Sequence, residues 1–130
     1  MAGWTNDVDG GGIGKAAILE LTLDAMEQGI SVVDADLNVV VFNRRFLDIL
    51  GLPADRFRPG DPFEAFVRFN AERGDYGPGV IEEQVQSRLA LARSPAPHCF
   101  ERTRSDGTVI EVRGTPIPGG GFLTTYTDVT

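Results

Sequence analysis

The stretch ISVVDADLNVVVFN, residues 30–43, has the pattern of two short strands joined by a tight turn. Ile30 to Asp34 and Val39 to Asn43 are rich in β-branched residues, which favour extended backbone. Residues 35–38 between them include the Asp and the Asn that suit a tight turn. We therefore predict a β-hairpin here, and the other elements are placed relative to it.

An amphipathic helix is predicted before the hairpin, from Lys15 to Gln28, with Gly29 placed to end it. Leu19, Leu23 and Met26 recur in it at helical spacing. Because a short amphipathic helix gains little stability alone, it must bury this apolar stripe somewhere. We predict contact with a second copy of the chain; packing on the sheet of its own domain is the competing interpretation.

Residues 1–14 end in a glycine-rich run, which is costly in backbone entropy to order, so we expect a flexible lead-in. The run and Lys15 have a superficial likeness to a phosphate-binding loop. However, Asp9 stands where that motif needs its first Gly, and Ala16 stands where it needs Ser or Thr. Because 130 residues are too few for two ordinary domains, residues 15–130 are predicted to form a single domain.

Three helical segments are predicted after the hairpin: Arg44 to Leu50, Phe63 to Arg73 and Ile81 to Arg93. Asn43 is a good N-cap for the first, which explains this residue without any functional role. Asp61 is the expected N-cap of the second, followed by Pro in the first turn and Glu three residues on. A Gly-Pro turn separates the second helix from the third.

The last third of the chain is predicted to be β-structure: His98 to Arg104, Val109 to Ile117 and Phe122 to Val129. Ile110 and Val112 alternate with charged residues, so this sheet has one apolar and one polar face. Two strands, three helices and three antiparallel strands give an α+β fold, with a five-stranded antiparallel sheet covered by helices on one face.

Composition excludes several classes of partner. The net charge of -7, from 12 basic and 19 acidic residues, repels phosphate backbones and anionic membranes, so no nucleic-acid partner is expected. Cys99 is the only cysteine and His98 the only histidine, too few for a disulfide or a structural zinc site. No apolar stretch of roughly 18 residues exists for membrane insertion by this segment. A reducing, cytoplasmic location fits.

Six local strings occur in a distinctive order: LDAMEQGI at 23–30, VDAD at 33–36, VFNRRF at 41–46, RGDYGPG at 73–79, DGT at 106–108 and TDVT at 127–130. In this order and spacing they resemble PAS domains, specifically the bacterial subgroup found in front of histidine kinase and cyclic-di-GMP enzyme modules. The resemblance extends from about residue 16 to the last residue and implies a PAS-like version of the α+β fold predicted above.

The resemblance implies a sensory domain without catalytic activity of its own. Such a domain binds a small ligand or mediates dimerisation, and it relays a signal to a C-terminal effector outside this sequence, most often a sensor histidine kinase. Any histidine kinase or diguanylate cyclase activity would belong to that missing domain. The resemblance also implies a homodimer, and a signal exit at the final TDVT string through Asp128 and Thr130.

A small-molecule pocket is expected between the helices and the sheet. Apolar residues that can line it come from the hairpin, the three helices and the last sheet: Phe42, Phe46, Phe66, Val85, Leu89, Ile110 and Val112. Aromatic and aliphatic residues at such spacings are also the usual content of a hydrophobic core, and the core interpretation stays open for all seven.

No cofactor is expected. The string NRRFL resembles the flavin-binding photoreceptor string NCRFL, but Arg44 occupies the position of the cysteine whose thiolate forms the flavin adduct. PAS domains that ligate haem place a His on the long helix before the third strand, and here that helix contains none. His98 follows this helix and is interpreted as structural or solvent-exposed, and Cys99 as a small strand residue.

One enzyme class is a rival. A cone-shaped α+β enzyme of the ketosteroid-isomerase type needs an acid or base in an apolar pocket beside an oxyanion donor. Asp75 and Tyr76 are the residues that could take those roles. They lie in a Gly-Pro turn, however, where Asp is expected as a turn former.

Overall fold

The computed structural model describes residues 14–130, which form five strands and four helices in an α+β order. The predicted lead-in and its glycine-rich run lie outside the described residues, apart from Gly14. The elements are α2 (Lys15–Ala25), β1 (Gly29–Val33), β2 (Val39–Phe42), α3 (Arg44–Leu50), α4 (Phe63–Glu72), α5 (Ile81–Arg93), β3 (His98–Thr103), β4 (Val109–Pro116) and β5 (Phe122–Asp128).

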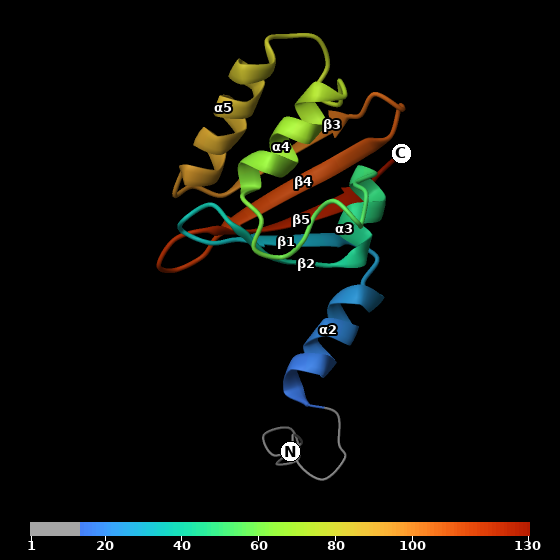
Figure 1. The fold of residues 1–130 in the computed structure, drawn as a ribbon, viewed down its shortest axis with the longest axis vertical. Coiled ribbons are helices and arrows are strands. Elements are labelled where there is room, and N and C mark those ends of the chain that lie inside the picture. Colours follow the sequence, from blue (N-terminus) through green and yellow to red (C-terminus); the bar gives the residue numbers. More distant parts are fainter. Residues whose placement is uncertain (1–13) are drawn as a thin grey trace.

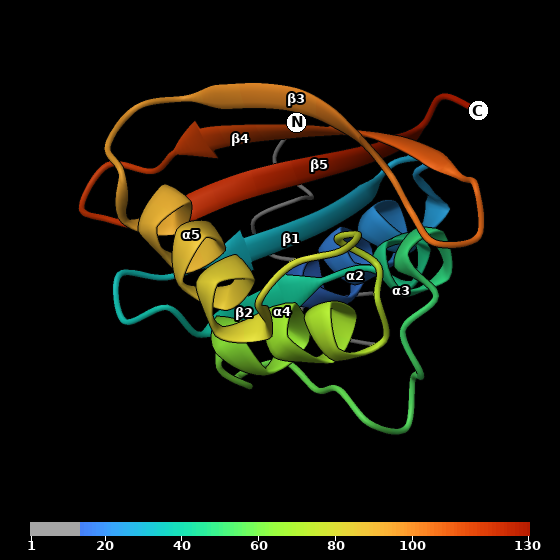
Figure 2. The same cartoon turned by 90° about the horizontal axis from the view of Figure 1, so that it is seen from above.

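The five strands form one antiparallel sheet in the order β2-β1-β5-β4-β3. The last strand of the chain therefore lies between the first strand and β4, which ties the two ends of the fold together. Helices α3, α4 and α5 lie together on one side of this sheet (Figure 2). The predicted α+β fold, with helices on one sheet face, is confirmed.

Alternation along the strands explains why only one face is covered. In β5, Phe122, Thr124 and Tyr126 are buried toward the helices, whereas Leu123 is exposed on the opposite face. Ile110 and Val112 are buried in β4 in the same way, with Arg113 exposed. The period of two therefore directs every second side chain into the space between the sheet and the helices.

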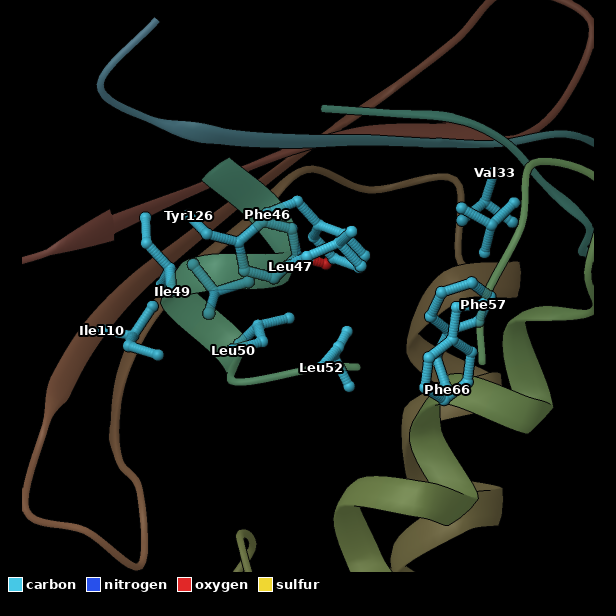
Figure 3. Close-up of a cluster of buried hydrophobic side chains, with 12 residues drawn as sticks. Val33, Phe46, Leu47, Ile49, Leu50, Leu52, Phe57, Phe66, Ile110 and Tyr126 are labelled. Carbon is cyan, nitrogen blue, oxygen red and sulfur yellow. The ribbon is translucent and has the colours of Figure 1, made fainter. Parts of the chain in front are cut away.

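That space is filled by aliphatic side chains and aromatic rings (Figure 3). Phe46 of α3 lies 5.2 Å, centroid to centroid, from Tyr126 of β5, and Phe66 of α4 stacks on Phe57 at 4.4 Å. Aromatic pairs at such distances add to the free energy gained from burying their area. They fix α3 against the sheet and the α3–α4 connection against α4.

Helix α2 projects away from the sheet, beyond the edge at β2 (Figure 1). It ends at Ala25, and not at Gln28 as predicted, because Met26 is already extended. Gly29 is the first residue of β1 and does not end the helix. Its role is close approach: a Cβ at Gly29 would lie 2.8 Å from the Phe46 Cα, too close for any other residue without a shift of α3.

The two predicted helix caps differ in outcome. Asn43 caps α3 as predicted, because its side chain accepts a hydrogen bond from the Phe46 N–H at 3.0 Å. Asp61 does not cap α4: Pro62 occupies the N-cap position, and the Asp61 carboxylate accepts from the Arg58 N–H at 2.9 Å. The carboxylate turns back to close the preceding loop, so this prediction was wrong.

Asn43 also does more than cap α3. Its Oδ1 accepts from the Ile30 N–H at 2.9 Å, and its Nδ2 donates to the carbonyls of Leu23 and Gln28 at 2.6 and 3.0 Å. The side chain is 1% exposed. One buried amide therefore joins the end of α2, the start of β1 and the start of α3.

A second buried polar group, Asp75, fastens the loop between α4 and α5. Its Oδ2 lies 2.8 Å from Arg73 Nη2 and 3.2 Å from Arg104 Nε, and its Oδ1 accepts from the Ser105 hydroxyl at 2.7 Å. Arg73 in turn donates to the Gly51 carbonyl after α3, at 2.7 Å. The carboxylate therefore clamps the α3 end, the α4–α5 loop and the β3–β4 turn together.

No helix within residues 14–130 combines the length and the apolar composition needed to cross a bilayer.

Candidate functional site

A cavity of about 80 Å³ lies between the inner face of the sheet and the helices α3, α4 and α5. Its lining comes from every layer of the fold, which is why no single stretch of sequence displays it. The lining residues are Val33, Phe46, Leu50, Phe63, Phe66, Val67, Asn70, Tyr76, Arg88, Leu91, Ala92, His98, Phe100, Arg102, Val112, Phe122, Thr124 and Tyr126.

The walls of the cavity are mainly apolar. Phe66 and Val67 of α4 face the sheet residues Val112 and Phe122, and all four side chains are buried. Phe100 of β3 completes the wall and is 36% exposed, so it stands at the rim. An apolar enclosure with a few polar groups is the usual form of a small-molecule site.

Two tyrosines, Tyr126 of β5 and Tyr76 of the α4–α5 loop, line the cavity. The Tyr126 hydroxyl lies 3.3 Å from Ser31 Oγ, and burial raises the pKa of this phenol, so it stays protonated at neutral pH. The Tyr76 hydroxyl accepts from Asn70 Nδ2 at 3.4 Å. Neither group has the neighbouring base that proton transfer would require, so both are suited to hydrogen bonding.

Two arginines lie against the Tyr76 ring. The Arg88 guanidinium carbon is 3.4 Å from the ring centroid and that of Arg102 is 5.1 Å from it, which are cation–π distances. Within residues 14–130, no carboxylate forms an ion pair with either of them. Burial lowers the pKa of the Arg88 guanidinium, although it stays charged at neutral pH.

His98 lies at the sheet edge of the cavity. Its ring is 5.1 Å from that of Phe122, and its Nδ1 is buried without a hydrogen-bond partner among the described residues. Burial lowers the pKa of the imidazole, which is therefore neutral at pH 7. Cys99, the next residue, is exposed. Within residues 14–130, no three His, Cys, Asp or Glu side chains gather as metal ligands would.

The seven predicted pocket residues are distributed between the cavity and the core. Phe46, Phe66 and Val112 line the cavity. The other four do not line the cavity and belong to the surrounding core. Ile110 lies in the buried cluster that contains Phe46 and Phe66, and Phe42 packs against the rings of these two residues. Val85 and Leu89 pack between α5 and α4.

The polar lining was missed by the sequence analysis. His98, Phe100 and Arg102 alternate along β3 and all line the cavity, while Arg88 lies one turn from Leu91 on α5. The alternation in β3 was the available signal, but the charged residues in the C-terminal half of this strand are also typical of a solvated sheet edge.

The residues of the rival enzyme interpretation are separated. Tyr76 lines the cavity, but Asp75 does not: both of its oxygens are taken by Arg73, Arg104 and Ser105. Burial raises the pKa of Asp75, but the Ser105 hydrogen bond and the two arginine charges outweigh burial and hold it below its ordinary value. A carboxylate so stabilised is a poor general base.

The predicted dimer residues stand apart from the cavity. Leu19 is 56% exposed on α2, Leu23 is half-buried near its end, and Met26 is half-buried just beyond it. No residue of α2 is buried, so the helix does not pack on the sheet of its own chain.

The predicted signal exit, Asp128 and Thr130, lies at the end of β5. Asp128, the last residue of β5, accepts from the Thr130 N–H and hydroxyl at 2.9 and 2.6 Å, and these bonds lower the pKa of its carboxyl. The Thr130 hydroxyl oxygen accepts from the Val109 N–H at 3.0 Å. Thr127, one residue before Asp128, accepts a hydrogen bond from Gln28 Nε2 at 2.9 Å. The predicted exit therefore lies beside the segment that connects α2 to β1.

Solved structures with this fold come from signalling proteins. The PAS domain of BvgS from Bordetella pertussis is 18% identical, with a TM-score of 0.61 over 89% of this chain and 87% of that one. A domain of a sensory box sensor histidine kinase/response regulator from Geobacter sulfurreducens is 20% identical, with a TM-score of 0.58 over 88% and 94%.

A third structure has a ligand. It is the PAS domain of the quorum-sensing receptor RpfR from Cronobacter turicensis in complex with C12:0, 17% identical, with a TM-score of 0.52 over 81% and 96%. A comparison with curated proteins finds no match. The model of the family described as PAS fold matches residues 23–130, nearly the whole described structure. The chain belongs to the PAS family.

Proposed function

We propose that this chain is the sensory domain of a signal-transduction protein, without catalytic activity of its own, and that its ligand occupies the cavity under α4 and α5. The observation that supports this most is the cavity itself, which is apolar, lined from every layer and equipped with few polar groups. The RpfR domain with C12:0 shows that a domain of this fold has room for a small molecule.

The ligand proposal is tested by native mass spectrometry of the purified chain. We expect an added small-molecule mass that disappears on gentle activation in the gas phase. The matched variant is Val112→Phe, which places a larger ring in the cavity wall and should remove the added mass while the chain stays folded. Retention of the same adduct by the variant would place the ligand elsewhere, and a bare mass from the wild type contradicts the ligand proposal.

The chain is further proposed to form a homodimer through α2. Leu19 and Leu21 are 56% and 62% exposed on a helix that has no fully buried residue. Exposed leucines at this density favour contact with another apolar surface. The identical helix of a second copy is the partner that this proposal assigns.

Leu19→Glu combined with Leu23→Glu should convert the dimer into a monomer, because four carboxylates would then be brought together at the helix pair. Sedimentation velocity measures the change directly. The control is Glu20→Gln on the same helix. Asp24→Ala is unsuited, because the Asp24 carboxylate accepts a hydrogen bond from the Arg44 N–H. An unchanged sedimentation coefficient for the double variant would show that α2 does not form the dimer interface.

Signal exit is proposed to run through Asp128 and Thr130, next to the base of α2. The Gln28–Thr127 hydrogen bond supports this, because it joins the segment between α2 and β1 to the last strand one residue before Asp128. A rearrangement of α2 in a dimer therefore has a direct route to the end of β5. The effector is proposed to be a bacterial cytoplasmic enzyme, a sensor histidine kinase before any other.

A further inference from the structure

The cavity has the opposite charge to the protein. The chain has 19 acidic and 12 basic residues, yet the cavity lining includes Arg88 and Arg102 and no Asp or Glu. With His98 neutral, these two guanidinium groups are the charges of the lining. An acidic protein has thus placed two cations at an otherwise apolar enclosure, and a cation in such surroundings favours an anion as its partner.

Most hydrogen-bond donors of these two arginines are free in the described structure. Each guanidinium has five N–H donors. Arg88 makes one long bond to the Gln84 carbonyl, and Arg102 makes one to the Asp75 carbonyl, both at 3.5 Å. By contrast, Arg73 donates to Asp75, Asn70 and two backbone carbonyls. The arginines of the cavity are therefore available for a bound group, whereas the arginines of the Asp75 clamp are not.

The Tyr76 ring positions the pair for such a group. Arg88 stacks on the ring at 3.4 Å and Arg102 approaches it at 5.1 Å, so the two cations lie close enough to repel each other. The ring quadrupole offsets part of that repulsion. Their hydrogen bonds leave most N–H donors of both groups without a partner in the described structure. A carboxylate between the two guanidinium groups would offset their charge further through charge-assisted hydrogen bonds.

We propose that the cavity binds a short-chain monocarboxylate, with the carboxylate held by Arg88 and Arg102 and the apolar body against Phe66, Phe100 and Val112. This rests on the proposed function of the cavity as a ligand site. The volume of about 80 Å³ selects the short body, because an engineered cavity that holds benzene has about 150 Å³. A longer acid requires α4 and α5 to move away from the sheet.

Isothermal titration of the 130-residue chain with butanoate and with butanamide, at matched ionic strength, tests the proposal. The two probes have nearly the same shape and differ in charge. Butanoate should bind at least about tenfold more tightly than butanamide, since a charge-assisted hydrogen bond is stronger than a neutral one. This comparison uses the wild-type chain and does not depend on any variant.

Arg88→Gln and Arg102→Gln should each bring the affinity for butanoate close to that for butanamide. Arg93→Gln, at the exposed end of the same helix α5, should leave the preference unchanged. Because Arg88 and Arg102 have no carboxylate partner in the described structure, neutralising them removes only the contacts with Tyr76 and one long hydrogen bond each. Both variants should therefore stay folded, which thermal unfolding checks.

Equal affinities of the wild type for the two probes would overturn the carboxylate inference and leave the cavity as a site for a neutral ligand. No binding of either probe up to about 20 mM would also overturn it. In that case the native mass spectrum decides separately whether the cavity has any ligand at all.

Discussion

Asn43→Ala should lower the free energy of unfolding by about 3 kcal/mol, well beyond the loss of an ordinary helix cap. The change removes four hydrogen bonds made by one side chain that is 1% exposed. It leaves the Ile30 N–H without this acceptor, whereas the Phe46 N–H keeps the Asn43 backbone carbonyl at 3.2 Å. A buried donor that loses its partner destabilises the folded state by the full free energy of its desolvation. Urea denaturation followed by circular dichroism measures the loss.

The matched control is Asn38→Ala, in the turn between β1 and β2. Its side chain makes no hydrogen bond in the described structure, so a change within about 0.5 kcal/mol is expected. Asn43→Asp should be at least as destabilising as Asn43→Ala at neutral pH, because its buried carboxylate keeps an acceptor for Ile30 and Phe46 but directs the second oxygen at two carbonyl oxygens. If Asn43→Ala were as mild as the control, the junction of α2, β1 and α3 would not depend on this amide.

Asp75→Asn should destabilise the fold by about 3 kcal/mol at neutral pH, because it leaves Arg73 and Arg104 without their shared counter-charge in a largely buried site. Asp106→Asn is the matched control, since Asp106 binds Arg104 from the solvent side, 3.1 Å away, with a side chain that is 54% exposed. An exposed pair contributes little, so Asp106→Asn should unfold close to the wild type. Thermal unfolding of the two variants beside the wild type gives the difference.

The advantage of the wild type over Asp75→Asn should also depend on pH. The folded-state pKa of Asp75 lies below its value in the unfolded chain, so the charged form stabilises the fold fully above about pH 4. As the pH falls through the folded pKa, the carboxylate is protonated and the difference between the two proteins shrinks. A difference that stays constant from pH 7 to about pH 3 would contradict the clamp.

The fold could be predicted from the sequence because its signals are local. β-Branched runs, the turn residues at 35–38 and the alternation in residues 109–113 each report on a few neighbouring positions. Asn43 was predicted as a cap by the same kind of signal. Its bonds to Leu23, Gln28 and Ile30 were not predictable, because they require α2 and β1 to be in place first.

The errors have a common physical cause, which is tertiary contact overriding a local preference. Glycine commonly ends helices, but Gly29 is required here by the close approach of Phe46 from α3. Asp75 lies in a turn, where aspartate is common, but its carboxylate is also the centre of an ion-pair clamp. Neither role is visible in a window of neighbouring residues.

The cavity shows the same limit. Phe46, Phe66 and Val112 line it, but the sequence could not separate them from Val85, Leu89 and Ile110, because all of them are apolar residues on inward-facing positions. The residues that give the site its chemical character, Arg88 and Arg102, come from α5 and β3. They meet only at the Tyr76 ring, after the helices have packed on the sheet.

Methyl-resolved NMR of the chain during titration with butanoate tests whether a small molecule occupies the space under α4 and α5. The methyl signals of Val67, Leu91 and Val112, which line the cavity, should shift together and saturate. The exposed methyls of Leu21 and Val129 should stay in place. Cavity methyls that do not move, or shifts confined to exposed side chains, would contradict occupancy of the cavity.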